Sequence, residues 1–159
     1  RKCDGLVLEM AIAQNISLAS LDKVLTGGLL NTVREAKQAD AFRDQLSIKS
    51  YSSHQKANQL SGGNQQKVVL SKWLVTNPEV LLLDEPTRGI DVNAKNEIYK
   101  LIDDLVSRGM AVVVASSELP EIMAIADRIV TLCEGRVTGM FARNEFSEEA
   151  ILRAALPAN

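Results

Sequence analysis

The order of the apolar patterns predicts an α/β fold preceded by a helical subdomain. Helical spacing dominates the first half of the 159-residue chain, whereas short apolar runs alternate with helical patterns in the second half. Two of these runs, at residues 80–83 and 111–115, have the length and unbroken apolar character of buried parallel strands. We therefore expect an α-helical subdomain over residues 1–76 and an α/β core over residues 77–159.

The composition is typical of one globular domain and excludes several classes of protein. The chain is 46% hydrophobic and 24% charged, and its formal net charge of -2 gives no basic surplus for nucleic-acid binding. No apolar run approaches the roughly 20 residues that cross a bilayer, and no signal-peptide pattern opens the sequence. Cys3 and Cys133 lack metal-ligand spacing, and the apolar residues around Cys133 predict a buried, reduced thiol. We expect a cytosolic protein.

Two helical patterns precede the first polar segment. A short helix is expected between Met10 and Leu18, after which Gly27-Gly28 breaks the pattern. Asn31 can cap a second helix, which continues to about residue 46. The apolar residues that mark this helix are Val33, Ala36, Phe42 and Leu46.

A polar segment separates the second helix from the third. Residues 47–59 are rich in Ser, Lys and Gln and predict a loop, with His54 on the surface. A third helix is expected from Ser61 until Asn77-Pro78 ends it. Its apolar face predicts that Trp73 lies in the core, and consists of Val69, Leu70, Trp73 and Leu74.

Strands and helices alternate from residue 80 onward. Asp91 can cap a helix between the two apolar runs, and Gly109 is placed to end it. After a short helix around residues 119–125, two strands meet at Glu134-Gly135, and Ser147 begins a last helix. The long helix has one apolar face, made of Ile98, Leu101, Ile102, Leu105 and Val106.

The string Ser61-Gly62-Gly63 stands at the start of the third helix. Serine is a frequent N-cap residue, and two glycines let an anion approach the backbone closely. The first turn then offers free N–H groups and the positive end of the helix dipole. The dipole contributes only about 0.3–1 kcal/mol at an exposed end, so hydrogen bonds must supply specificity. An ordinary helix start is the alternative reading.

Two adjacent carboxylates, Asp84 and Glu85, follow the first apolar run. They are expected at the C-terminal end of a strand, where open α/β sheets bind ligands. Because successive strand residues alternate in direction, the two side chains face different ways. One carboxylate can then bind Mg²⁺ while the other accepts a proton from water. A solvated turn closed by Pro86 is the alternative.

Together these strings resemble the ATP-binding cassette (ABC) ATPases of the sugar-uptake branch. Residues 60–67, LSGGNQQK, resemble the signature motif, and residues 80–87, VLLLDEPT, resemble the Walker B motif. The resemblance covers nearly the whole chain and implies the second nucleotide-binding domain of a sugar importer. It implies a P-loop NTPase core with a helical signature subdomain, with ATP and Mg²⁺ as cofactors. Asp84 would bind the metal, and Glu85 would be the catalytic base.

The same resemblance implies roles for the remaining candidate residues. Ser61, Gly62, Gly63 and Asn64 would contact the γ-phosphate of ATP held by the opposite cassette, with Asn64 where many relatives have glutamine. Asp91 matches the D-loop, which crosses the dimer interface. The implied partners are ATP, a second ABC cassette and membrane permease subunits, with no nucleic acid. The protein would then lie on the inner face of the cell membrane.

Ser117, the second candidate catalytic residue that the resemblance implies, departs from the family pattern. ABC ATPases commonly have a histidine here that contacts the γ-phosphate, whereas serine can donate one hydrogen bond and carries no charge. The same loss recurs in the second cassette of tandem sugar-uptake ATPases. It keeps open a non-catalytic cassette that only completes a partner's site. A non-transport ABC protein is a further alternative, but the chain has neither an inserted coiled coil nor a basic linker.

The sequence contains no G-x-x-x-x-G-K-[ST] phosphate loop. Neither Gly27-Gly28 nor Gly62-Gly63 continues into such a motif. Residues 1–6 resemble the segment just after the family's Q-loop, so the phosphate loop and its strand are expected upstream. We therefore expect the 159-residue chain alone to be inactive. The resemblance also implies that the strand at residues 111–115 lies beside that of Asp84, and we expect it to expose an unpaired edge.

Overall fold

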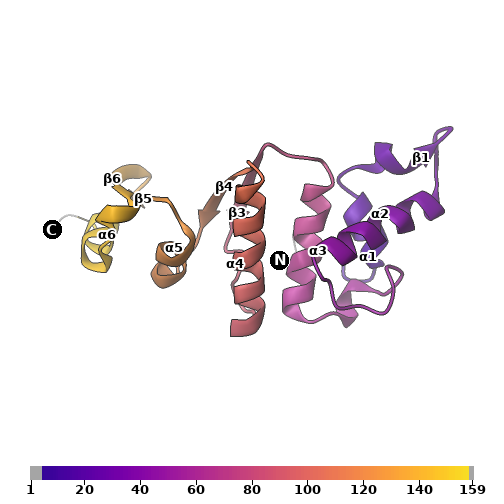
Figure 1. Ribbon diagram of the computed structural model, residues 1–159, viewed down its shortest axis with the longest axis horizontal. Helices are drawn as coiled ribbons and strands as arrows, with labels where there is room; N and C mark the ends of the chain where they lie inside the picture. Colours follow the sequence, from indigo (N-terminus) through magenta and orange to yellow (C-terminus); the bar gives the residue numbers. More distant parts are fainter. Residues whose placement is uncertain (1–4, 158–159) are drawn as a thin grey trace. The chain divides into compact units, whose positions relative to one another are not determined.

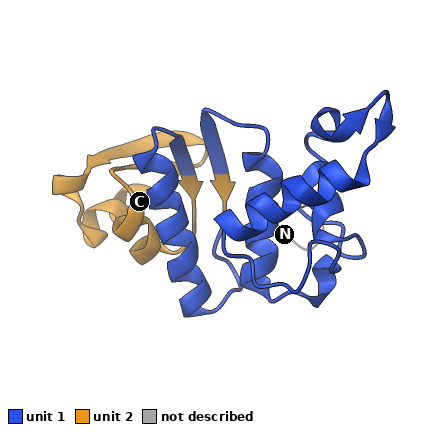
Figure 2. Cartoon of the chain, turned by 45° about the vertical axis from the view of Figure 1, so that its right-hand side comes forward, with its two compact units in different colours: residues 1–82, 86–113 blue, residues 83–85, 114–159 orange. Residues whose placement is uncertain are grey.

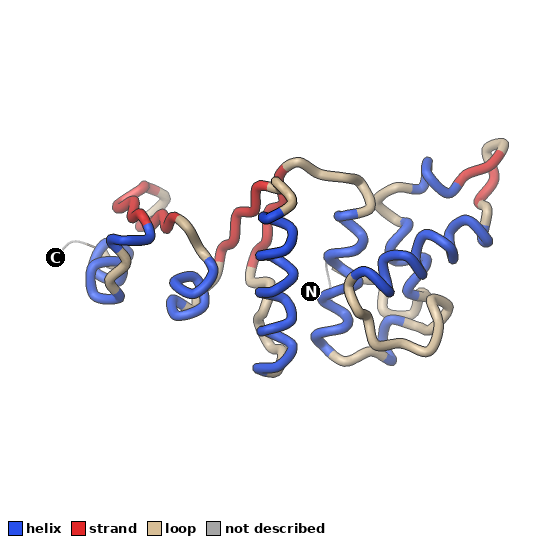
Figure 3. The backbone as a smooth tube through the Cα atoms, viewed as in Figure 1, coloured by secondary structure: helices blue, strands red, loops and turns tan. Residues whose placement is uncertain are grey.

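The structure, a computed structural model, describes residues 5–157, so the prediction for Cys3 lies outside the described residues. It forms two compact units. Residues 1–82 and 86–113 make up the first unit, and residues 83–85 and 114–159 the second (Figure 2). Helices and strands alternate in the second half of the chain, as expected for an α/β fold (Figure 3). The predicted boundary near residue 76 stays a prediction.

The first unit begins with helical elements that surround one apolar core (Figure 1). Helix α1 (Ile12–Ser17) contacts both α2 (Thr32–Gln45) and α3 (Gly62–Leu74). The minor elements are η1 (Leu21–Val24), β1 (Leu25–Thr26), β2 (Leu29–Leu30) and η2 (Ala57–Gln59). The most deeply buried apolar side chains are Ile12, Ile16, Val24, Ala39, Ala57, Val68, Leu70 and Ile98.

Ala11 occupies the N-cap position of helix α1, but its side chain cannot accept a hydrogen bond from the helix. The loop of residues 47–59 supplies backbone acceptors instead, because Ile12 N donates to Gln55 O at 2.9 Å and Ala13 N to Ser53 O at 2.9 Å. These bonds satisfy two of the N–H groups that every helix start leaves unpaired. The predicted loop is therefore confirmed except for η2 at its end, and it has a specific structural role.

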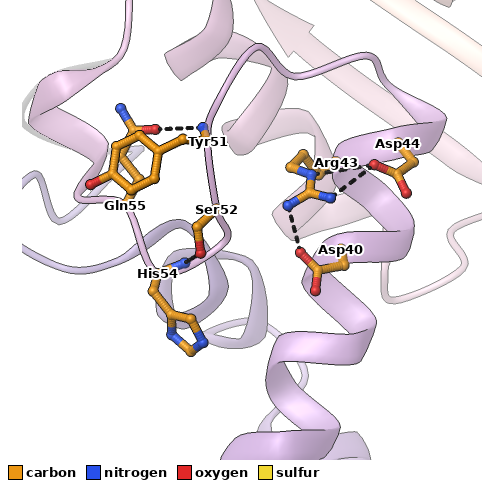
Figure 4. Close-up of polar contacts among 7 residues, drawn as sticks. All are labelled: Asp40, Arg43, Asp44, Tyr51, Ser52, His54 and Gln55. Carbon is orange, nitrogen blue, oxygen red and sulfur yellow. Dashed lines mark hydrogen bonds and ion pairs between the residues drawn. The ribbon is translucent and has the colours of Figure 1, made fainter.

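Polar contacts hold this loop and the helix before it (Figure 4). Tyr51 N donates to Gln55 Oε1 at 3.2 Å, and the exposed His54 donates its backbone N–H to Ser52 Oγ at 3.1 Å. On α2, the guanidinium of Arg43 pairs with Asp40 at 2.8 Å and with Asp44 at 3.2 Å. The loop thus has a defined backbone path between α2 and α3.

Three of the predicted helix caps, at Asn31, Asp91 and Ser147, are confirmed. Asn31 Oδ1 accepts from Arg34 N at 3.0 Å at the start of α2, and Asp91 Oδ1 accepts from Ala94 N at 2.9 Å at the start of α4 (Val92–Ser107). Ser147 caps α6 (Glu148–Ala155) in the same way, although its bond to Ala150 N is longer, at 3.4 Å. Gly109 follows α4 with a φ of +93°, the left-handed conformation that ends helices.

Strands β3 (Val80–Asp84) and β4 (Ala111–Ala115) are hydrogen-bonded neighbours, as predicted. The expectation that both are buried on both faces is wrong for the part of the chain that the structure describes. Their burial alternates, leaving Leu82 73% and Val113 57% exposed. The physical reason is that α4 and the other described elements do not cover these side chains.

Two further burial predictions are also wrong. Trp73 is 50% exposed, with Lys72 Nζ 5.3 Å from its ring centroid, which is a cation–π distance. Val33, an expected apolar marker of α2, is 79% exposed, because α2 buries Glu35 and Ala39 instead. Helical spacing shows which residues share a face, but it does not show what covers the edge of that face.

The second unit is built on an antiparallel hairpin. Strands β5 (Arg128–Cys133) and β6 (Arg136–Ala142) pair through a turn at Glu134 and Gly135, both with positive φ, as predicted from the sequence. Helix α6 packs on the hairpin, and α5 (Leu119–Ile125) and η3 (Arg143–Glu145) complete the unit. Cys133 is a free cysteine of intermediate exposure, so the prediction of a fully buried thiol is wrong. Among residues 5–157, none of the helices has the length and apolarity to cross a membrane.

Candidate functional site

The predicted site residues divide between the two units. Asp84, Glu85 and Ser117 belong to the second unit, whereas Ser61, Gly62, Gly63, Asn64 and Asp91 belong to the first.

Asp84 and Glu85 stand at the C-terminal end of β3. Asp84 is the exposed last residue of the strand. Glu85 has a φ of +46°, a left-handed conformation that costs a residue with a side chain on the order of 1–3 kcal/mol. Its backbone N–H donates to Ala115 O at 2.8 Å, which anchors this conformation to the end of β4.

The structure brings Glu85 together with Ser117. Ser117 donates its backbone N–H, not its hydroxyl, to Glu85 Oε1 at 2.9 Å. This bond holds one oxygen of the Glu85 carboxylate. The contact links the residues that follow the two neighbouring strands, where ligands bind in open α/β sheets.

Ser116 orders the loop that follows β4, which sequence reasoning missed. Its Oγ accepts from Glu118 N at 3.1 Å and donates to Glu121 Oε2 at 3.4 Å. Serine side chains often accept from the backbone N–H two residues later, so Ser116 could have been predicted to form this turn from the sequence. The turn holds the backbone N–H of Ser117 in place.

In the first unit, Ser61 occupies the N-cap position of α3 without capping it through its side chain. Its carbonyl accepts from Gln65 N at 2.9 Å, but no backbone N–H donates to its hydroxyl. Instead, Asn64 Nδ2 donates to Ser61 Oγ at 2.9 Å. The predicted side-chain cap by Ser61 is therefore wrong: the donor to its hydroxyl is the Asn64 amide and not a backbone N–H.

Asn64 also reaches back to the preceding loop. Lys49 N donates to Asn64 Oδ1 at 2.9 Å, so both ends of the amide make hydrogen bonds. Lys67, one turn later on α3, is buried and donates to Ser47 O at 3.1 Å while pairing with Glu97 at 2.8 Å. Sequence reasoning missed Lys49, Lys67 and Glu97, since these contacts depend on how the loop and α4 meet α3.

Gly63 is buried against α4. A Cβ on Gly63 would lie 2.5 Å from Ala94 Cβ, so the missing side chain permits the close approach of the two helix starts. A phosphate contact through the Gly63 backbone stays a prediction. Gly62 is half-buried in the first turn of α3, and Asp91 is exposed at the start of α4, where it acts as the cap.

Comparison with known proteins defines the class to which this fold and these motifs belong. A sequence model described as ABC transporter matches residues 4–88, more than half of the chain. The chain belongs to the ABC transporter family.

Individual relatives resemble almost the whole chain. It is 55% identical over 157 residues to the ribose import ATP-binding protein RbsA of Rhodopirellula baltica, covering 99% of this chain and 31% of the relative. It is 57% identical over 155 residues to the xylose import ATP-binding protein XylG of Moorella thermoacetica, covering 98% and 31% respectively. The chain thus spans about a third of the length of the curated relatives it matches.

Solved structures support the same fold. A dimeric ATP-binding cassette in a post-hydrolysis state with ADP and Pi superposes with a TM-score of 0.72 at 27% identity, covering 89% of this chain and 60% of that one. An inward-facing ABC transporter of the metal-chelate type superposes with a TM-score of 0.79 at 19% identity, covering 94% and 59%, and shows the fold alone. The structure is therefore part of an α/β nucleotide-binding cassette.

Proposed function

We propose that the full-length protein containing this chain is the ATP-hydrolysing subunit of an ABC importer for a sugar. The observation that carries this proposal is the pair of carboxylates at the C-terminal end of β3, with Glu85 oriented by the backbone N–H of Ser117. The names of the relatives, which are import proteins for ribose, xylose and arabinose, support a sugar as the cargo.

Glu85 is proposed as the general base. Its fixed oxygen holds the carboxylate in place, and its second oxygen accepts a proton from the water that attacks the γ-phosphate of ATP. Ser61, Gly62 and Gly63 would contribute hydrogen bonds to that phosphate from the start of α3, in the cassette opposite the bound ATP. Asp91 would cap α4 and also face the partner cassette.

Asp84 suits a magnesium ion. Carboxylate oxygens are preferred ligands of Mg²⁺, which usually keeps waters and substrate phosphates in its remaining positions. Asp84 would supply one carboxylate to the ion, with phosphate oxygens and water in the remaining positions. When bound, Mg²⁺ would neutralise charge that develops on the phosphates.

The expected setting is the inner face of the cell membrane, where the subunit would pair with a second cassette and with permease subunits. A second candidate is a cassette that binds ATP without hydrolysing it. Ser117 favours this alternative, because its hydroxyl cannot carry the charge of the histidine found in many relatives.

The test is magnesium-dependent phosphate release by the full-length protein with its permease. Glu85→Gln should lower kcat by about 10²–10⁴-fold, because the amide cannot accept the proton. Glu149→Gln makes the same chemical change on the exposed side of α6 and should leave kcat unchanged. Equal kcat for the wild type and Glu85→Gln would favour the non-hydrolysing cassette.

A further inference from the structure

The amide of Asn64 can have only one orientation. A backbone N–H is a donor, so the Asn64 atom that faces Lys49 N must be the carbonyl oxygen. The NH₂ group then faces Ser61 Oγ, at 2.9 Å, and donates to it. Both ends of the side chain are thus engaged within the protein.

This orientation determines how the Ser61 hydroxyl can act. A serine hydroxyl has one proton to donate and two lone pairs to accept with. Because Asn64 donates to one lone pair, the Ser61 proton cannot point toward Asn64 and must point elsewhere. Ser61 is exposed, so this proton can reach an external acceptor.

The residues that contact Asn64 are themselves held in place by further hydrogen bonds and an ion pair. Lys49, whose N–H binds Asn64, lies two residues after Ser47, whose carbonyl accepts from the Lys67 ammonium at 3.1 Å. Lys67 has a side chain only 5% exposed and pairs with Glu97 on α4 at 2.8 Å. Loop, α3 and α4 are therefore tied together around the start of α3.

We propose that Asn64 is a positioning residue that presents the Ser61 hydroxyl as a hydrogen-bond donor to a phosphate oxygen of ATP. Asn64 does not bind the nucleotide itself, which revises the role expected for it from the sequence. The inference rests on the proposed function, because the acceptor is the phosphate of ATP.

The test is a double-mutant cycle on ATP hydrolysis by the full-length protein. In Asn64→Asp, one carboxylate oxygen still accepts from Lys49 N, while the other accepts from Ser61 and turns its proton inward. We expect kcat to fall about 10- to 100-fold, with KM changing less than about threefold. In a Ser61→Ala background, where no hydroxyl remains to be oriented, Asn64→Asp should change kcat less than about twofold.

Two controls separate positioning from charge and from misfolding. Asn96→Asp adds the same charge at an exposed position of α4 and should leave kcat unchanged. Asn64→Leu should accelerate hydrogen exchange of the Lys49 amide by removing its acceptor, whereas Asn64→Asp should keep that exchange slow.

The outcomes distinguish this inference from the function on which it rests. Independent, additive losses from Ser61→Ala and Asn64→Asp in an active protein would overturn the inference alone. Rapid exchange of the Lys49 amide in the wild type would do the same. A wild-type protein that does not hydrolyse ATP with its permease would overturn the proposed catalytic function and the inference together.

Discussion

Glu85 is oriented by a backbone group rather than by the side chain of Ser117. The donor in the 2.9 Å bond is the Ser117 N–H, which any residue except proline provides. The replacement of the family's common histidine by serine therefore leaves this contact intact. The resemblance to ABC ATPases implies a second contact there, from a charged histidine ring to the phosphate, which a serine would not provide.

Substitutions at Ser117 should separate these two roles. In the full-length protein, Ser117→Ala should keep kcat within about threefold, whereas Ser117→Pro should lower it about 10- to 100-fold by removing the donor to a charged group. Phosphate release measures both, and Ser117→Gly tests whether altered flexibility matters. A loss in Ser117→Ala as large as that in Ser117→Pro would mean that the hydroxyl is needed.

The meeting of α3 and α4 depends on Gly63. Because a Cβ at residue 63 would lie 2.5 Å from Ala94 Cβ, Gly63→Ala should separate the helix starts and destabilise the fold by about 1–3 kcal/mol. Urea unfolding measures this change. Adding Ala94→Gly should restore much of the loss, with Ala94→Gly alone as the control. Additive losses in the double variant would show that the two residues do not collide.

The pair of Lys67 and Glu97 joins the same helices and should make their stability depend on pH. The hydrogen bond from Lys67 lowers the pKa of Glu97 below its ordinary value of 4.5. A carboxylate with a lowered folded-state pKa contributes stability above its unfolded pKa and loses it as the pH falls through the folded value. Neutral solution therefore retains this contribution, and acid removes it.

Glu97→Gln is the variant that reveals this dependence. It should lower the urea midpoint at pH 7, and the difference from the wild type should shrink below about pH 4.5. Asp103→Asn, at an exposed position on the same helix, is the control and should leave the midpoint nearly unchanged. A difference that stays constant from pH 7 into acid would contradict the assignment.

At the scale of the whole molecule, the exposed apolar residues of β3 and β4 govern the behaviour of the isolated chain. Val80, Leu82 and Val113 are 54%, 73% and 57% exposed. We expect the 159-residue chain to self-associate as its concentration rises, because exposed apolar strands pair with other chains. Sedimentation velocity measures this association, and the double variant Leu82→Lys with Val113→Lys should reduce it.

A matched control uses the hairpin of the first unit. Leu29 is 77% exposed on β2, a strand of only two residues, so Leu29→Lys should leave self-association nearly unchanged. A wild-type chain that remains monomeric at every concentration would show that the exposed residues of β3 and β4 do not drive association.

Local signals in the sequence predicted most elements and motifs, whereas contacts between residues far apart in the sequence were not predicted. Asn31, Asp91 and Gly109 were predictable because caps and helix stops depend on a few neighbouring residues. The β1–β2 pair was missed, since two-residue strands carry too little pattern. The buried Asn15 was also missed. Its NH₂ group donates to the carbonyls of Val7, Met10 and Ala11, and its Oδ1 accepts from Val7 N. Only the folded chain brings these backbone groups together.

The backbone contacts of the loop of residues 47–59 limit how its length can vary among homologues. Loops usually tolerate insertions and deletions. Here the carbonyls of Ser53 and Gln55 complete the start of α1, and the N–H of Lys49 meets Asn64. Every one of these contacts uses a backbone atom of the loop, which most residue types can provide. These backbone contacts therefore fix the number of residues between Lys49 and Gln55, while the burial of Ser53 and the bond from Tyr51 N to the Gln55 side chain restrict residue identity as well.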